Sequence, residues 1–168
     1  MNKIELTNAL RAFLPAEAVI WEQEALRPYE CDGLPAYRQM PMVAVLPHTV
    51  EQLQQVVRLC YQQDIPIVAR GAATGLSGGA LPLADGVLLG LSRFNRILDI
   101  DPLARTARVQ PGVRNLAITE AAAAYDLYYA PDPSSQIACT IGGNAVSYTH
   151  LTLPTMLAQC RSRWSPYH

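Results

Sequence analysis

The glycine-rich stretch RGAATGLSGGA, residues 70–80, constrains the fold of this chain more than any other feature. It holds four of the ten glycines and directly follows the apolar run IPIVA at 65–69. Glycine costs roughly 0.5–1 kcal/mol relative to alanine inside a regular element, so such a cluster indicates unusual dihedrals or a group pressed against bare backbone. The stretch therefore predicts a strand followed by a loop that is shaped around a ligand.

The residues around this loop predict a strand, a helix and a second strand. The apolar run MVAVLP ends at Pro47, and Thr49 then begins a helix with Gln52 as the partner of a capping box. The run 65–69 predicts a buried strand. Five residues fall at helical spacing on one face, which we expect to be buried against a sheet: Val50, Leu53, Val56, Val57 and Cys60.

Three further strands are predicted at 86–91, 96–101 and 105–111, with Asp101 and Pro102 in a hairpin turn between the last two. Helical pattern returns from 113 to 125, where the run of alanines has high helix propensity. The N-terminal sequence MNKIELTNALRAFLP predicts a short amphipathic helix. Residues 28–42 contain three prolines and predict an extended segment that leads into the domain. Because the predicted strands are grouped and do not alternate strictly with helices, the pattern predicts an α+β fold.

Three kinds of phosphate-binding loop compete for residues 70–80. A P-loop needs a lysine and a Ser or Thr after its last glycine, but Leu81 and Pro82 follow here. The Rossmann spacing and the helix that should follow it are also absent. The third kind is a concave loop whose backbone N–H groups bind an anion, with hydroxyls from Thr74 and Ser77. The alternative is that the glycines serve only tight turns between strands.

Composition excludes several classes of protein. The net charge is −1 and the arginines are scattered, which disfavours nucleic acid or an anionic membrane as a partner. Lys3 is the only lysine, so lysine chemistry has almost no candidates. The four cysteines form no C-x-x-C pair, which argues against zinc and against a secreted disulfide framework. No signal peptide or run of 18 apolar residues is present, so we expect an intracellular protein without a membrane span.

Several motifs in order give a resemblance to a known family. PIVARGAATGLSGGA at 66–80, PGV at 111–113 and YAPDPSSQIACTIGGN at 129–144 resemble the FAD-linked subunits of bacterial glycolate oxidases. These belong to the flavoprotein superfamily of vanillyl-alcohol oxidase and p-cresol methylhydroxylase. PYECDGL at 28–34 and QPGVRNLAI at 110–118 extend the match, which runs from about residue 27 to residue 144.

The resemblance implies the N-terminal part of a PCMH-type FAD-binding domain, truncated, in which two small α/β subdomains hold an extended FAD. It places the pyrophosphate on Arg70, Gly71, Ala72, Ala73, Thr74, Gly75, Ser77 and Gly78. It places the flavin side of the cofactor on Pro131, Asp132, Pro133, Ser134, Ser135, Gln136, Ile137, Thr140, Ile141, Gly142 and Gly143. Thr74 stands where covalently flavinylated relatives have a histidine, which implies non-covalent FAD.

The resemblance ends abruptly after Asn144. We therefore expect residues 1–37 to form the N-terminal helix and leading segment, 38–145 a partial FAD-binding domain, and 146–168 a tail foreign to the family without a native packing role. Relatives carry their catalytic residues in the later half of a much longer chain. The resemblance thus implies no catalytic residue and no metal here, and a chain that is inactive alone.

The implied function is the FAD-binding portion of a 2-hydroxy-acid oxidoreductase that converts glycolate or D-lactate to the 2-oxo acid. The alternative is a non-catalytic nucleotide-binding or assembly module. In the longer protein, a second flavoprotein subunit and an iron–sulfur subunit are the implied partners. The implied location is the cytoplasm, with contact to the inner face of the membrane through those subunits.

Individual residues also carry plainer interpretations. Arg70 fits either a phosphate or a neighbouring carboxylate, and Asp132 fits either a ligand or a turn, since Pro-Asp-Pro-Ser is strong turn sequence. Cys139 predicts a small buried side chain. His48 precedes a helix and predicts a surface residue.

Overall fold

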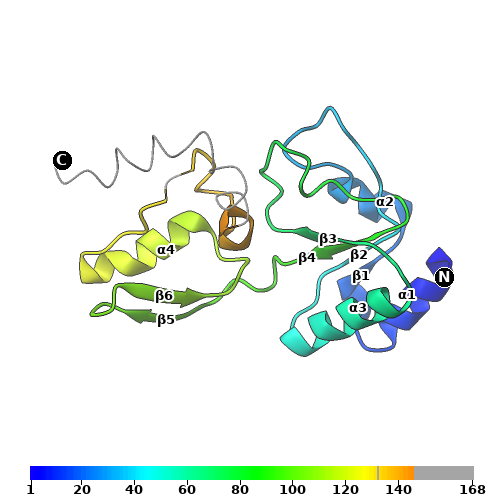
Figure 1. Ribbon diagram of the computed structural model, residues 1–168, viewed down its shortest axis with the longest axis horizontal. Helices are drawn as coiled ribbons and strands as arrows, with labels where there is room; N and C mark the ends of the chain where they lie inside the picture. The colour runs from blue at the N-terminus through cyan, green and yellow to red at the C-terminus, as the bar shows by residue number, and fades with distance from the viewer. Residues whose placement is uncertain (132, 146–168) are drawn as a thin grey trace.

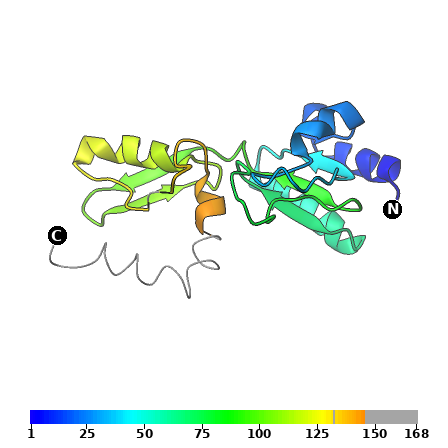
Figure 2. The same cartoon turned by 90° about the horizontal axis from the view of Figure 1, so that it is seen from above.

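The computed structural model describes residues 1–131 and 133–145, which form two lobes side by side (Figures 1 and 2). The first lobe contains a four-stranded sheet and the second a two-stranded sheet. The elements of the first lobe are α1 (Lys3–Arg11), η1 (Ala16–Ala18), β1 (Val19–Ile20), α2 (Gln23–Leu26), η2 (Arg27–Tyr29), β2 (Val43–Val45), α3 (Val50–Gln62), β3 (Ile67–Arg70) and β4 (Val87–Gly90). Those of the second are β5 (Ile97–Asp101), β6 (Thr106–Val109), α4 (Asn115–Ala122) and η3 (Ala123–Tyr125).

The sheet of the first lobe has the strand order β1-β2-β4-β3. Strands β2, β4 and β3 are parallel, with Val43 and Ile67 both opposite Val87, whereas β1 is antiparallel to β2. β3 therefore lies at an edge and is only partly buried, so the prediction of a buried strand at 65–69 was wrong in its burial. The glycine-rich loop leaves the carboxyl end of β3, which is where open parallel sheets bind ligands.

Helices cover both faces of this sheet (Figure 1). Leu6 and Leu10 of α1 join Val56 and Cys60 of α3 on one face, and all four side chains are fully buried. Leu26 of α2 packs with Ala44 and Leu88 on the other face. The predicted N-terminal helix is confirmed, and the residues before position 38 contribute both a helix and strand β1 to the core of this lobe.

Helix α3 has the predicted cap at Thr49, but Gln52 does not complete the predicted capping box, and the helix buries a narrower face than predicted. Thr49 Oγ1 accepts a hydrogen bond from the Gln52 N–H (3.3 Å), and Gln52 Oε1 accepts one from the N–H of the exposed His48 (2.8 Å). Val50 and Val57 are 52% and 42% exposed, so their predicted burial was wrong. Each helical residue turns by about 100°, and Val57 therefore lies well around the helix from its buried neighbour Val56.

The second lobe is the β5–β6 hairpin with α4 packed along it (Figure 2). The predicted turn is confirmed, since Asp101 Oδ1 accepts hydrogen bonds from the N–H groups of Leu103 and Ala104, both at 2.9 Å. Cys139 is buried, as predicted. No helix within residues 1–131 and 133–145 is long and apolar enough to cross a membrane. The predicted tail, 146–168, lies outside the described residues.

Candidate FAD-binding site

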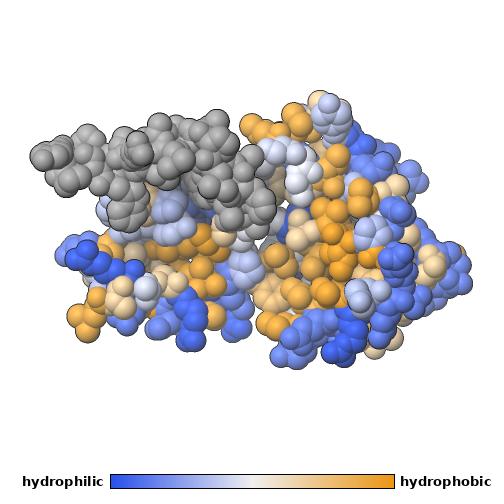
Figure 3. All heavy atoms as spheres, viewed as in Figure 1, coloured by the Kyte–Doolittle hydropathy of each residue, from blue (hydrophilic) through white to orange (hydrophobic). Residues whose placement is uncertain are grey.

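A cavity of about 450 Å³ lies between the lobes, a size within the roughly 300–1,000 Å³ range of small-molecule sites. The space-filling view shows the furrow that separates the lobes, beside apolar surface on the first lobe (Figure 3). Both lobes and the segment that joins them supply its lining, which consists of Gly71, Ala72, Ser92, Asn95, Ile97, Gly112, Val113, Arg114, Ala117 and Thr140.

Two of the predicted binding segments meet in this cavity, at Gly71 and Thr140. The Thr140 side chain is buried, and its Oγ1 has no hydrogen-bond partner within the described part of the chain. A Cβ added at Gly71 would overlap that oxygen. A buried hydroxyl without a partner is costly, so a polar ligand atom in the cavity would be a favourable partner for this oxygen.

The glycine-rich loop presents its backbone N–H groups unbonded. From Gly71 to Ala80, none of these groups donates a hydrogen bond to another described residue. Its carbonyls are used instead, since Arg70 O accepts from the Leu91 N–H (2.9 Å) and Gly75 O from the Gly33 N–H (3.0 Å). Ala73 and Gly78 adopt left-handed backbone, with φ of 55° and 74°. Successive free amides with changes of backbone hand form an anion-binding concavity.

Packing does not explain all of the glycines in this loop. A Cβ at Gly75 or Gly79 would meet no atom within 4 Å, and neither residue has the left-handed φ that requires glycine. Two tight turns alone would therefore not call for glycine at these positions. Bare backbone facing open space fits close approach by a cofactor.

Arg70 makes contacts that neither sequence interpretation included. Its guanidinium donates to the carbonyls of Cys31 (2.6 Å), Pro28 (3.3 Å) and Tyr29 (3.4 Å), and it also lies 5.7 Å from the centre of the Tyr29 ring. Burial lowers the pKa of Arg70, while nearby Cys31, Tyr29 and Asp32 act in the opposite direction. The side chain thus ties the base of the loop to the leading segment, and contact with phosphate stays a prediction.

The second predicted segment is held by the start of α4. Asn115 Nδ2 donates to Pro131 O (3.2 Å), and the N–H groups of Asn115 and Leu116 donate to Cys139 O and Gln136 O, both at 3.0 Å. Residue 131 and the described residues 133–137 do not line the cavity, and Asp132 lies outside the described residues. The flavin contacts predicted for this segment therefore stay predictions.

The glycine pair at 142–143 packs on the PGV motif at 111–113. The N–H groups of Ile141 and Gly142 donate to Val113 O and Pro111 O, both at 2.9 Å. A Cβ at Gly142 would lie 2.8 Å from Pro111 Cβ, so packing alone accounts for this glycine. Gly143 has open space in front of its Cα instead.

Sequence reasoning missed several lining residues, of which Arg114 is the most informative. Among the described residues of the lining it is the only charged one, it is exposed, and it follows directly after P-G-V, where its position in the motif was the available signal. Ser92 and Asn95 lie in the segment between β4 and β5, which has no sequence pattern that marks it. No group of three or more His, Cys, Asp or Glu in the described residues could hold a metal ion.

Two lobes around a cavity, which the glycine-rich loop with its free amides reaches at Gly71 and Ala72, fit a domain that binds a dinucleotide. The same fold occurs in solved structures. The structure matches p-cresol methylhydroxylase with substrate bound at a TM-score of 0.65 and 32% identity, over 74% of this chain and 25% of that one. It matches the fold of alkyldihydroxyacetonephosphate synthase at a TM-score of 0.74 and 22% identity, over 83% of this chain and 28% of that one.

The family model described as FAD binding domain matches residues 41–153, and the chain belongs to this family. Over 86% of its length the chain is 56% identical to glycolate oxidase subunit GlcD of Escherichia coli K12, of which it covers 29%. It is 31% identical to D-lactate dehydrogenase of Anaerostipes hadrus, over 87% of this chain and 31% of that protein. The predicted family, the α+β PCMH-type fold and FAD as the cofactor are confirmed.

Proposed function

We propose that this chain is the FAD-binding portion of a flavin-dependent 2-hydroxy-acid oxidoreductase. The observation that carries the proposal is the run of free amides from residue 71 to residue 80 beside the unpaired Thr140 hydroxyl. Relatives add the substrate class. Glycolate oxidase, D-lactate dehydrogenase and D-2-hydroxyglutarate dehydrogenase all carry in their names an acid with a hydroxyl on the carbon next to the carboxylate.

Each wall of the cavity would have its own part in holding FAD. The loop amides would donate to the pyrophosphate, and Arg114 would add positive charge from the opposite lobe. Thr140 Oγ1 would regain a hydrogen-bond partner. When bound, FAD would supply the hydride acceptor that oxidation of a hydroxy acid at its α-carbon to the 2-oxo acid requires, with the hydroxyl proton passing to a base.

The residues around the cavity favour dissociable FAD. Among the described residues that line it, none is a Cys, His or Tyr that could bond to a flavin, and the resemblance places Thr74 where covalently flavinylated relatives have a histidine. The nearby Cys139 is 3% exposed, and its Sγ accepts a hydrogen bond from Asn144 Nδ2 (3.4 Å). We therefore propose that FAD is held by hydrogen bonds and packing alone.

Ligand fluorescence anisotropy and competition with the purified chain test the cofactor assignment. FAD should bind, ADP should compete because it carries the pyrophosphate, and FMN and riboflavin should compete poorly because they lack it. Added salt should weaken binding, since the contact is partly electrostatic. A non-catalytic nucleotide module would instead bind ADP with the same affinity as FAD. Absence of FAD binding at high micromolar FAD would refute the proposal.

The reaction itself is tested in the longer protein. Glycolate or D-lactate added without oxygen should bleach the visible absorbance of the bound flavin, while this chain alone should show no turnover. We further propose, because GlcD is named as a subunit, that the whole protein assembles in the cytoplasm with a second flavoprotein subunit and an iron–sulfur subunit. Purification of the tagged whole protein from its host would test this proposal. The two other subunits should co-purify with it, and recovery of the tagged protein alone would contradict the proposal.

A further inference from the structure

Residues 28–34, here termed the clamp segment, pack against the back of the glycine-rich loop. The Gly33 N–H donates to Gly75 O at 3.0 Å. The Gly33 Cα lies so close to the loop that an added Cβ would be 2.8 Å from both Thr74 O and Gly75 O. Only glycine fits this contact, although the φ of Gly33 is not left-handed.

This contact fixes the direction of the loop amides. A peptide unit is planar and trans, so its N–H points opposite to its C=O. The carbonyl of Thr74 shares a peptide unit with the Gly75 N–H, and the carbonyl of Gly75 shares one with the Leu76 N–H. Because both carbonyl oxygens lie against Gly33, both N–H groups are directed away from the clamp segment, and neither has a partner in the described chain.

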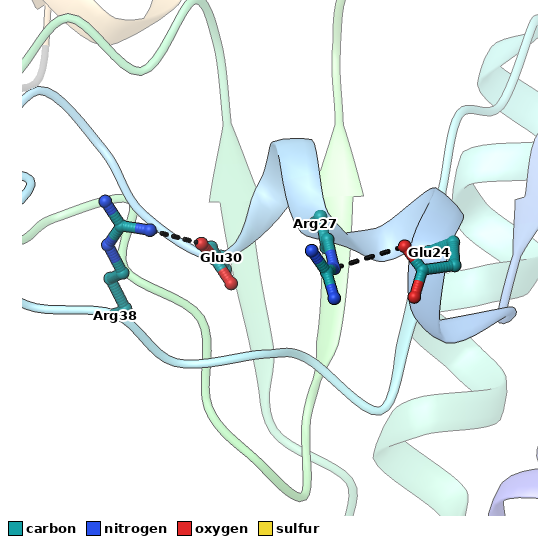
Figure 4. A network of polar contacts seen from close by, with 4 residues as sticks. All are labelled: Glu24, Arg27, Glu30 and Arg38. Carbon is teal, nitrogen blue, oxygen red and sulfur yellow. Dashed lines mark hydrogen bonds and ion pairs between the residues drawn. The ribbon is translucent and has the colours of Figure 1, made fainter.

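The clamp segment is itself held in shape at three points. The Arg70 guanidinium, at the base of the loop, binds the carbonyls of Pro28 and Cys31. Asp32 is 8% exposed, and its Oδ1 accepts from the Leu34 N–H at 2.9 Å, a turn that spans Gly33. Glu30 pairs with Arg38 (2.9 Å; Figure 4), and Glu30 O accepts from the Gln39 N–H at 2.8 Å.

We infer that the clamp segment positions the FAD-binding loop: Gly33, in a turn that Asp32 fixes, holds the loop carbonyls from behind and thereby turns the loop amides toward the cofactor. The inference rests on the proposed function. It extends the site to residues outside the FAD-binding domain match, which begins at residue 41. Neither Gly33 nor Asp32 lines the cavity, so both are positioning residues rather than contacts of FAD.

The first test is Gly33→Ala, whose methyl group would push the Thr74 and Gly75 carbonyls outward. We expect the Kd for FAD to rise at least about tenfold, which corresponds to about 1.4 kcal/mol. Gly86→Ala is the matched control. Its Cβ would crowd Pro66 O at 3.0 Å, at the amino ends of β3 and β4, whereas the loop leaves the carboxyl end of β3, so it perturbs packing without touching the loop. Its Kd should stay within about twofold of the wild-type value.

The second test keeps glycine in place and removes the turn. Asp32→Ala frees the Leu34 N–H and should raise the Kd for FAD about three- to tenfold, whereas Asp32→Asn retains an acceptor oxygen and should recover most of that loss. In the absence of FAD, hydrogen exchange at the Gly33 amide should speed up in Asp32→Ala and not in Asp32→Asn. This exchange measurement does not depend on cofactor binding.

The outcomes separate the inference from the proposed function. Faster Gly33 exchange with unchanged FAD affinity would overturn the inference and leave the FAD site standing. So would equal losses of affinity in Gly33→Ala and Gly86→Ala. If the wild-type chain binds no FAD, the proposed function fails. The role of the clamp segment is then tested by hydrogen exchange alone. An unchanged exchange rate of the Gly33 amide in Asp32→Ala would refute that role.

Discussion

The contact between Gly71 and Thr140 gives the sharpest test of how the two lobes form the site. A methyl group at Gly71 would overlap Thr140 Oγ1 but would lie 3.7 Å from Thr140 Cβ, an ordinary contact distance. The Thr140 hydroxyl group is therefore the only part of that side chain that the added methyl group would overlap. Overpacking of this kind costs roughly 1–3 kcal/mol. We expect Gly71→Ala to lower the free energy of unfolding by about 1–2 kcal/mol, since Thr140 can relieve part of the overlap by rotating.

The effect of Gly71→Ala on the free energy of unfolding should have the opposite sign once the Thr140 hydroxyl is removed. Thr140→Ala alone loses a methyl group worth about 1 kcal/mol but also removes a buried oxygen without a partner, so its net effect should be small. In that background Gly71→Ala should stabilise by roughly 0.4–1 kcal/mol, because alanine has less freedom in the unfolded chain and Gly71 does not need a left-handed φ.

Urea unfolding of wild type, both single variants and the double variant measures the coupling directly. The expected changes give a coupling free energy of roughly 1.5–3 kcal/mol, within the range for residues in contact. Coupling below about 0.5 kcal/mol would show that the two lobes do not meet at these residues, and the description of the cavity would fail with it. Parallel FAD titrations should show weaker binding for Thr140→Ala, which lacks the hydroxyl.

Two further predictions concern α3. Thr49→Ala removes the cap that accepts from the Gln52 N–H, and we expect a loss of about 1 kcal/mol in urea unfolding, with Thr49→Ser close to wild type; equal losses would contradict the capping role. Burial raises the pKa of the Cys60 thiol to about 11 from 9.0. The thiol is neutral in both states below pH 9, but between pH 9 and 11 it ionises first in the unfolded chain. The free energy of unfolding should therefore fall by up to about 1.4 kcal/mol per pH unit there, and Cys60→Ala should flatten this slope. An unchanged slope would show that Cys60 is not responsible.

The sequence predicted most of the local structure because each element carries its own physical signal. The cap at Thr49, the hairpin turn at Asp101 and the apolar runs gave the positions of helices and strands to within a few residues. The errors were in burial. The strand at 65–69 proved to be an edge strand, and Val50 and Val57 of α3 are exposed, because periodicity indicates a face but not which neighbour covers it.

The sequence alone predicted the kind of site, since clustered glycines and hydroxyls without lysine leave backbone amides as the donors. Tertiary structure decided which residues build it. Arg70 binds carbonyls some forty residues earlier in the chain and Gly142 is required by Pro111, and neither contact is visible in local sequence. Arg114 lines the cavity, and its place after the P-G-V motif was its one sequence signal. Contacts between distant residues depend on strand order and on how the lobes pack, and only the folded chain brings these residues together.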